Sequence, residues 1–517
     1  MLRFLKKLCA GKATDLDEKI ARLNYPLEEH KFSRSLDENV AVIKKLFNNV
    51  DIVQYKMIQS PGKDPIRYFL IFIDGVVHSE IVNNNIVEPL MTKRPEGGGT
   101  LLESLLATVV QVGESKKINT FKALIENVTH GDTVLFTDGC DQAAVFNTKQ
   151  FALRSITEPE NEKVLSGPRE GFTESLIQNL SLILRRARTN ELKTKTMTLG
   201  KRTQTTVCIC YLDSLANKDV LEELLRRLNK IDIDGILDSN YITEQIHDFP
   251  NSPFRTVGGT ERPDVVLGKL LEGRIAILVD NTPVALTVPY LFIENFQVNE
   301  DYYFNFYYSS FSRLLRIMGF FLTLAVPGLY IAVVAFHQEI LPLQLLIRIA
   351  LERQKVPLPA NVEAVIMLIV FDVLRETGVR MPSNIGQALS IVGALVIGQA
   401  AVEASLVAAP MIIVVAATGI TSLLMPKLNA PIIFWRMLLL LLASSFGFFG
   451  LTIGLSLLFI HLNNLKSFGV DHLSLEGNFS FQKNKDIFIR SPWPDMIERP
   501  EKLSENEVRQ QGGGNNG

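Results

Sequence analysis

The residues with the clearest potential for chemistry lie in the uncharged run 385–402 and directly after it. Small side chains recur at every fourth position of this run, at Gly386, Ser390, Ala394 and Gly398. Residues four apart share one face of a helix, so these positions form a ridge that allows close contact with another helix. Gln399 and Glu403 add a polar and an ionisable side chain to the same stretch.

Two interpretations of this stretch stay open. In the first, its polar groups make an interhelical hydrogen bond and an interfacial turn at Glu403. In the second, the helix lines a water-filled path, where ionisable groups inside a membrane usually lie. The small face then packs against other helices, Val392, Leu395 or Gln399 faces the lumen, and Glu403 marks its mouth.

A second candidate site lies upstream, where Pro263 and Asp264 follow Glu261 and Arg262. Proline is favoured in the first turn of a helix, and a carboxylate near a helix N-terminus is stabilised by the helix dipole. Glu261 is therefore predicted at a helix start, where the simplest role is a local cap. For Arg262 we predict that the side chain docks the two units of the head, or a neighbouring subunit.

Signatures of enzymes, cofactors and metals are missing from the sequence. The run Gly97–Gly99 precedes a helix but lacks the Lys-Ser/Thr pair of a phosphate-binding loop. The 7 histidines have no ligand spacing, and the 4 cysteines form no zinc pattern. We therefore expect no catalytic residue, no cofactor and no metal. A formal net charge of −2 gives no reason to expect nucleic acid as a partner.

Charge is distributed unevenly along the chain, and this predicts a membrane protein. Residues 1–313 carry charges at the density of a soluble protein, whereas four later runs have no Asp, Glu, Lys or Arg. Each run is long enough to cross a bilayer as a helix, which satisfies its own backbone groups there. The four predicted spans are 317–336, 385–402, 404–425 and 437–462.

The segment between the first two runs has a different character. Residues 340–376 contain two apolar stretches, one too short to span and one that carries Glu363 and Asp372. They are predicted to be amphipathic helices at the membrane interface, or one charged helix packed inside the bundle. Four spans return the C-terminal tail to the side of the head.

The N-terminal 310 residues alternate between strand-like and helical patterns, which predicts a soluble α/β head of two subdomains. Ser35 and Glu38 have the spacing of a capping box at the start of the first helix. The predicted strands are 53–58, 68–77, 133–136, 143–146, 194–198, 206–212, 274–279 and 284–288. The predicted helices are 35–47, 101–112, 120–128, 173–188, 219–230 and 264–271.

These patterns divide the chain into four parts. They are a first head subdomain at 1–130 with a variable N-terminus, a second at 131–310, a helical membrane domain at 311–468, and a polar, partly disordered tail at 469–517. The fold class is α+β, with a helical transmembrane domain after the soluble α/β head. Because Met1–Cys9 lacks a continuous apolar core, no cleaved secretion signal is expected, and the head is expected in the cytosol.

Several motifs, in order along the chain, resemble those of GerA-type A subunits of bacterial spore germinant receptors. They are Thr260–Asp264, Gly273–Asp280, Asp301–Tyr303, Phe336–Gln338, Val356–Pro359 and Gly386–Ala404. The agreement extends from about Thr133 to Phe468, and residues 1–130 carry little of it.

The resemblance implies a multi-pass protein of the spore inner membrane that works with a permease-like B subunit and a lipoprotein C subunit. It further implies a homo-oligomer in membrane lipid, with a pentamer as the expected form, that acts as a nutrient-gated ion channel. Since the resemblance assigns nutrient recognition mainly to the B subunit, no nutrient pocket is predicted in this chain.

Two other functions stay open. One is a non-conducting scaffold of the sporulation membrane, or a paralogue from a sporulation operon that acts beside the receptors. The other is a solute transporter, which is less favoured because the predicted spans show no internal repeat.

Overall fold

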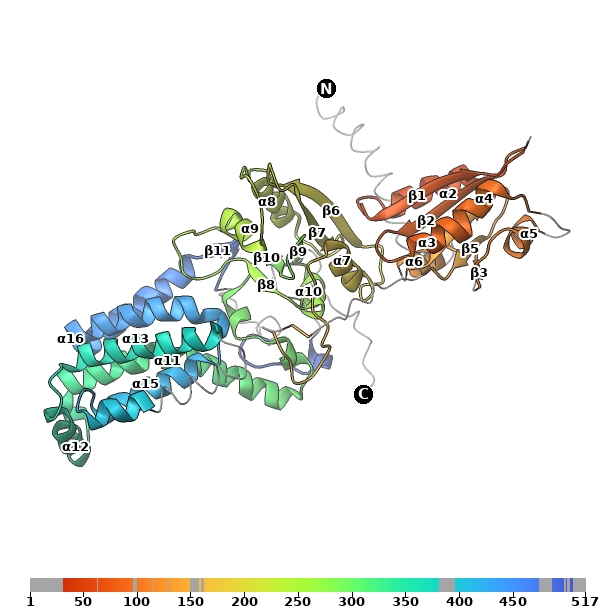
Figure 1. Cartoon of the computed structure of the whole chain (residues 1–517). Helices are drawn as coiled ribbons and strands as arrows, with labels where there is room; N and C mark the ends of the chain where they lie inside the picture. Colours follow the sequence, from red (N-terminus) through yellow and green to blue (C-terminus); the bar gives the residue numbers. More distant parts are fainter. Residues whose placement is uncertain are drawn as a thin grey trace, which may run out of the picture.

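The computed structural model describes residues 31–62, 64–95, 100–113, 115–129, 131–148, 158–159, 162–380, 396–473, 486–496, 499 and 503–504. Three parts follow one another in Figure 1: two sheet-containing units, which form the head, and a helical bundle. We call the end of the bundle beside the head the head end. The opposite end, where α12 (Leu343–Gln354) lies, is the far end.

The first unit is a five-stranded antiparallel sheet with the strand order β1-β2-β4-β5-β3. Its strands are β1 (Val53–Gln59), β2 (Arg67–Ile73), β3 (Ser115–Ile118), β4 (Thr133–Thr137) and β5 (Ala143–Phe146). Alternate residues of β2 enter two cores, as a strand buried on both faces requires. Phe69 and Ile71 pack with α2 (Leu36–Leu46) and α6 (Phe121–Thr129). The other face packs with η1 (Val82–Val87), which continues the short helix α3 (Ser79–Ile81), and with α4 (Glu88–Thr92) and α5 (Leu101–Thr108).

The second unit repeats this topology. Its strand order, β6-β7-β9-β10-β8, equals that of the first unit with every strand number raised by five. The strands are β6 (Leu192–Leu199), β7 (Thr205–Leu212), β8 (Gly258–Thr260), β9 (Ile275–Val279) and β10 (Ala285–Val288). Helices α7 (Leu176–Leu184) and α10 (Pro263–Leu270) cover one face, and α8 (Lys218–Leu228) and α9 (Ser239–Ile246) cover the other.

Both units also begin with the same hydrogen bonds. The Asn39 side chain accepts from Ser33 N (2.9 Å) and donates to Ser33 O (2.6 Å). In the second unit Asn179 makes the equivalent pair with Thr173, at 2.7 and 2.5 Å. The sequences Phe-Ser-Arg-Ser-Leu-Asp-Glu-Asn (32–39) and Phe-Thr-Glu-Ser-Leu-Ile-Gln-Asn (172–179) share this motif. The two units of the head are therefore an internal repeat, which was not predicted from the sequence.

The repeat also corrects the expected capping box. Ser35 stands at the N-cap but makes no side-chain capping bond, and Glu38 instead accepts from the Ser33 hydroxyl at 2.5 Å. The orphan amide of Leu36 is satisfied by Asp138 (3.3 Å), which lies in the turn after β4. The cap is thus built from a distant turn, and pattern spacing alone does not reveal it.

The predicted strands and the six predicted helices of the head are confirmed, apart from their ends. All strand pairs are antiparallel, and four of them, β1–β2, β4–β5, β6–β7 and β9–β10, are hairpins joined by short turns. The division predicted at residue 130 cuts through the first sheet, since β4 and β5 pair with β2 and β3. The short elements η1, α9, β3 and β8 had no periodic pattern strong enough to predict them.

The loop before β1 of the first unit contacts the edge strand β6 of the second unit. Val50 forms a parallel bridge with Thr194 at the edge strand β6. Asp51 accepts hydrogen bonds from the amide and the hydroxyl of Thr196, at 2.9 and 2.8 Å. Buried residues of both units form one continuous apolar cluster, so the head packs as a single body.

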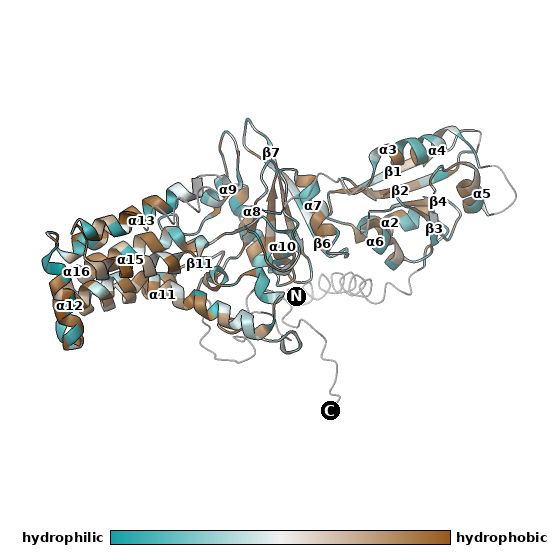
Figure 2. Cartoon of the chain, turned by 60° about the horizontal axis from the view of Figure 1, so that its bottom comes forward, coloured by the Kyte–Doolittle hydropathy of each residue, from teal (hydrophilic) through white to brown (hydrophobic). Residues whose placement is uncertain are grey.

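The bundle contains α11 (Phe306–Phe336), α12, α13 (Ala360–Arg380), α15 (Ala409–Ser422) and α16 (Asn429–Asn464). Two helical stretches, 306–336 and 426–464, are long and apolar enough to cross a membrane. Figure 2 shows the apolar colouring concentrated in this part of the molecule. The predicted span 317–336 lies inside α11.

Helix α16 is a hairpin of two antiparallel limbs. The backbone of Gly447 leaves the helical region with φ 60° and ψ −137°. The rings of Trp435 and His461 lie 5.6 Å apart, whereas a straight helix would separate these positions by about 39 Å. Each limb therefore has a length of about 27 Å, close to the thickness of a bilayer core. This differs from the single span predicted at 437–462.

The other predicted spans also change in detail. The run 404–425 forms the shorter helix α15, because residues 404–408 are a turn before it. Most of the run 385–402 lies outside the described residues, and 396–403 are helical. In the segment 340–376, α12 lies across the far end while α13 packs along the bundle. α13 is thus a charged helix packed in the bundle, and a position of α12 at the membrane interface stays a prediction.

The tail after the hairpin returns to the head. Lys466–Ser467 (β11) and Val470–Asp471 (β12) form a small ladder. Ser504 then bridges to Ala216, and Leu503 is buried in the core of the second unit. The described part of the predicted polar tail is thus packed against the head, whereas residues 505–517 lie outside the described residues.

We predict that the hairpin depends on Gly450. A Cβ at this position would lie 2.0 Å from the carbonyl oxygen of Leu442 in the opposite limb. Gly450→Ala should therefore lower the free energy of unfolding by about 1–3 kcal/mol, as overpacking does. The thermal midpoint of the full chain in detergent measures this effect. Gly268→Ala, in α10 with nothing within 4 Å, is the matched control, and equal midpoints for both variants would contradict the prediction.

Candidate functional site

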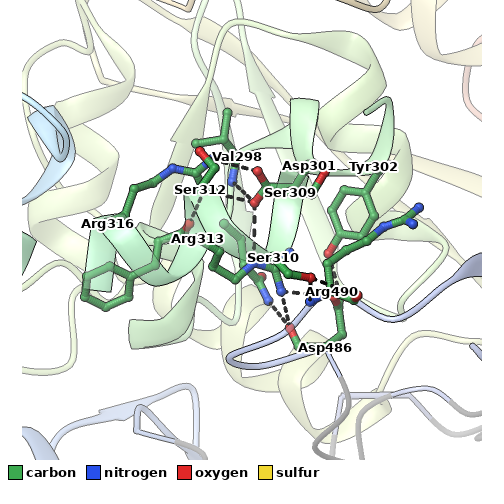
Figure 3. A network of polar contacts seen from close by, with 12 residues as sticks. Val298, Asp301, Tyr302, Ser309, Ser310, Ser312, Arg313, Arg316, Asp486 and Arg490 are labelled. Atoms are coloured by element: carbon green, nitrogen blue, oxygen red, sulfur yellow. Dashed lines mark hydrogen bonds and ion pairs between the residues drawn. The ribbon is translucent and has the colours of Figure 1, made fainter. Parts of the chain in front are cut away.

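A set of four buried or partly buried charges lies where the head meets α11 (Figure 3). Asp301, in the 3-10 helix η3 (Asn299–Tyr302), accepts from both terminal nitrogens of Arg316, at 2.6 and 2.9 Å. The same carboxylate is 3.4 Å from Nε of Arg313, whose side chain is fully buried. One head carboxylate thus compensates two arginines of the first turns of α11.

The tail supplies the second carboxylate of this junction. Arg313 Nη1 donates to the backbone oxygen of Asp486 at 2.6 Å and lies 3.0 Å from its Oδ1. The hydroxyl of Tyr302 donates to Asp486 Oδ2 at 2.6 Å. Burial and the neighbouring Asp486 carboxylate raise the pKa of Tyr302 well above its ordinary value, so this hydroxyl stays a donor. Head, α11 and tail are therefore held by one charge-balanced network.

The start of α11 positions these arginines. Asn305 caps the helix by accepting from Tyr307 N. Residues three and four apart share a helix face, so Ser309, Arg313 and Arg316 all point toward the head. Each is buried or partly buried, whereas Tyr307 on the opposite face is exposed.

A second buried ionic cluster supports the junction from the head side. Glu294 receives a hydrogen bond from Arg274, lies 3.0 Å from Lys269 Nζ and accepts from Leu291 N at 2.6 Å. Burial opposes ionisation of Glu294, but Arg274 and Lys269 outweigh it and lower its pKa to about 2. Glu294 is therefore ionised at neutral pH and fixes the loop that precedes η3.

The exit of the hairpin is tied to the same loop. Ser467 accepts from Tyr290 N at 2.9 Å and donates to Thr256 O at 2.7 Å. The buried ring of His472 lies with Nδ1 3.0 Å from Tyr290 O. Burial lowers the pKa of His472 below its ordinary value, so the ring is neutral in the folded protein.

Arg262 is also part of this region. Its buried guanidinium pairs with Asp264 at 2.8 Å and donates to the backbone oxygens of Glu162 and Pro168. Glu261 precedes the N-cap residue Arg262, and its amide donates to Glu162 at 3.0 Å. The contacts of Arg262 within this chain hold the loop 162–168 to α10, and a contact with a neighbouring subunit stays a prediction.

Buried charges also occur inside the bundle. Asp372 of α13 accepts from Arg436 of α16 at 2.5 Å and lies 3.2 Å from Arg375 Nη2. Nearer the far end, Glu363 accepts from Ala408 N at 2.6 Å. These bonds fix α13 against α15 and the first limb of α16.

The structure describes three of the eight predicted pore or packing residues. Gly398 is buried, and a Cβ there would meet Ile412 of α15 at 3.7 Å. Gln399 and Glu403 are exposed and joined by a 2.9 Å hydrogen bond, on another side of the helix. Gly386, Ser390, Val392, Ala394 and Leu395 lie outside the described residues, so their role in conduction stays a prediction.

The junction was not predicted from the sequence. Asp301 belongs to one of the motifs that carry the family resemblance, and Arg313 and Arg316 immediately precede an uncharged run. Asp486 lies 173 positions from Arg313, and only the fold brings them together. Among the described residues no group of three or more His, Cys, Asp or Glu side chains is placed to hold a metal ion.

Comparison with known proteins identifies the family. The model of the family described as Bacillus/Clostridium GerA spore germination protein matches residues 41–502. The chain belongs to this family. It is 40% identical to spore germination protein KA of Bacillus subtilis (strain 168), over 92% of this chain and 88% of that protein. It is 41% identical to the uncharacterized membrane protein YfkQ of the same organism, over 92% of each chain.

A solved structure is also similar to part of this GerA-family chain. It is the crystal structure of the N-terminal domain of the A subunit of the Bacillus megaterium spore germinant receptor GerK3. The match covers 51% of this chain and 98% of that domain, with 30% identity and a TM-score of 0.41.

We predict that Asp301→Asn loosens the junction, because it leaves Arg313 and Arg316 short of one buried negative charge. Breaking a buried pair costs about 3–5 kcal/mol, so the thermal midpoint should fall strongly. Trp493, whose ring lies 5.8 Å from Tyr302, reports the junction by fluorescence in a Trp435→Phe background, since the chain has 2 tryptophans.

The control for this experiment is the exposed pair of Lys201 and Asp232, at 2.6 Å. Asp232→Asn removes a carboxylate in the same way but should cost no more than about 1 kcal/mol. Equal thermal midpoints and unchanged Trp493 emission for Asp301→Asn and Asp232→Asn would show that the junction stabilises the protein no more than an exposed ion pair does.

A separate prediction concerns pH. Because the folded-state pKa of His472 lies below the ordinary value of 6.5, its contribution to stability is complete above that pH. It is lost as the pH falls below this value toward the lowered pKa, since the unfolded chain then binds the extra proton. His472→Gln should flatten this decline in thermal midpoints, whereas the control His78→Gln, in the first unit, should retain it. If the thermal midpoint depends on pH with the same slope in both variants, His472 is not the source of the decline.

Proposed function

We propose that this chain is the A subunit of a spore germinant receptor and converts germinant binding into ion release. The carrying observation is the junction in which Asp301 and Asp486 hold Arg313 and Arg316 at the start of α11. Because these charges are buried and balanced, a rotation of the head moves α11 with it. Contacts of α11 with both limbs of α16 and with α15 pass this motion into the bundle.

The proposal places the bundle in the spore inner membrane as a multi-pass domain and the head in the cytosol. Among the described residues five helical segments run along the bundle: α11, α13, α15 and the two limbs of α16. Both ends of the hairpin lie at the head end, since Lys427 pairs with Glu162 at 2.8 Å and Ser467 bonds to Thr256. The permease-like B subunit, the lipoprotein C subunit and further copies of this chain are the proposed partners.

Ions are proposed to pass along the helix that ends at Glu403. Its Gly398 side packs against α15, while Gln399 and Glu403 point away from that contact. A water-filled path shared by several subunits requires polar side chains that each single chain leaves exposed. Val392 and Leu395 are the apolar residues proposed to narrow it.

Release of potassium trapped in liposomes that carry the full chain tests this proposal. Leu395→Ala should widen the constriction and increase the rate of potassium release. Gln399→Ala and Glu403→Ala should also change this rate. Ile413→Ala, at an exposed apolar position of α15, is the matched control and should leak like the wild type. Gly398→Leu should lower the amount of assembled protein, because the space beside Ile412 admits little more than a Cβ.

Flux that is equal in all assembled variants would remove this helix as the conduction path. The second candidate, a non-conducting membrane component that acts beside receptors, would then be favoured. A monomer in mild detergent that takes up solute would instead favour a transporter.

A further inference from the structure

The far end of the bundle contains a cavity of about 570 Å³. It is open on one side and is lined by the last turns of α11, by α12, by the segment 356–361 and by Ser444 of α16. The volume lies in the range of small-molecule sites, about 300–1,000 Å³. None of the head residues discussed above contributes to it.

The lining of the cavity combines apolar side chains with polar ones and has a single cationic group. Its apolar walls come chiefly from α11 and α12, including Ile349 and Ala350. Arg353 is the charged side chain on this wall, and the neutral polar groups are Gln338, Gln354, Asn361 and Ser444. Apolar walls with a few convergent polar groups are typical of a binding site.

Arg353 makes no ion pair in the part of the chain that the structure describes. Glu352 pairs with Lys355 at 2.8 Å. Glu363 accepts from Ala408 N at 2.6 Å and acts on Arg353 only from beyond ion-pair distance. A partly buried guanidinium beside apolar surface is disfavoured unless an anion compensates it. The guanidinium fork is suited to carboxylate and phosphate oxygens.

The position of the cavity agrees with a ligand that also has an apolar part. The outer face of α12 exposes Leu343, Ile347 and Leu351. A helix with such a face and basic residues lies at a membrane interface, so the opening would be near the lipid surface. This placement rests on the membrane location given under Proposed function.

We propose that this cavity binds an amphiphilic anion, a molecule with one carboxylate or phosphate group and an apolar chain. The anionic group pairs with Arg353, and the chain lies against Ile349 and Ala350. Such a molecule comes either from the bilayer, as an anionic phospholipid, or from solution, as a free fatty acid. The two sources share the same recognition chemistry.

Equilibrium binding of labelled decanoate to the purified full chain in a neutral maltoside detergent tests the proposal. We expect saturable binding that decanol does not compete for efficiently. Arg353→Gln should weaken decanoate binding at least tenfold, while Arg353→Lys should retain part of it. Arg348→Gln, an exposed arginine of the same helix that does not line the cavity, is the matched control and should bind within twofold of wild type.

Nanodiscs separate the two sources. Phosphatidylglycerol that co-purifies with wild type but not with Arg353→Gln, quantified by mass spectrometry against phosphatidylcholine, identifies a lipid ligand. Decanoate binding without phosphatidylglycerol retention identifies a free solute. Ala350→Trp fills the cavity and should abolish both, which keeps the test decisive if Arg353→Gln fails to fold.

Equal binding in wild type, Arg353→Gln and Ala350→Trp, or equal loss in Arg348→Gln and Arg353→Gln, overturns the proposal. Absence of decanoate and phosphatidylglycerol binding in wild type overturns it as well. These assays measure binding and not potassium release. Failure of the binding site can therefore be distinguished from failure of the channel.

Discussion

The arrangement of the molecule depends on how two buried arginines at the start of α11 are compensated. A buried guanidinium without a carboxylate is costly, and Arg313 has no exposed surface on its side chain. Asp301 comes from the head and Asp486 from the tail, so the ion pairs form only when three distant segments are in place. The head cannot shift relative to α11 without uncovering charge, which makes the junction stiff.

The glycines of α16 impose a second constraint, one of space. Gly447 turns the chain with a positive φ, and a side chain at Gly450 or Gly454 would collide with the opposite limb. The limbs therefore approach closely and present a continuous surface to α11, where Gly328 meets Ala443 and Leu451. Stiff attachment at the head and close packing along the bundle make α11 the element that both parts share.

Much of this organisation was predictable from local pattern, and the rest was not, for physical reasons. Apolar runs and strand periodicity reflect burial of each segment by itself, so the strands, most helices and the apolar bundle were predicted. The hairpin at Gly447 was not, because small residues in an apolar run look alike whether they pack two helices or reverse one. The repeat of the head was visible in 32–39 and 172–179, and comparison of those segments would have revealed it.

At the candidate site too, local spacing could be read from the sequence, whereas pairs of residues far apart in the chain could not. Gly398, Gln399 and Glu403 attracted attention because their spacing is local, while the pairs Arg313–Asp486 and Asp372–Arg436 join segments 173 and 64 positions apart. Charges beside or inside apolar runs were visible as Arg313, Asp372 and Arg436, and such charges require partners wherever the runs pack. The partners of these charges lie on other segments, so each ion pair fixes two separate segments to each other. Charged residues in or beside apolar runs, which have no partner nearby in the sequence, are therefore the first candidates for residues that couple the segments.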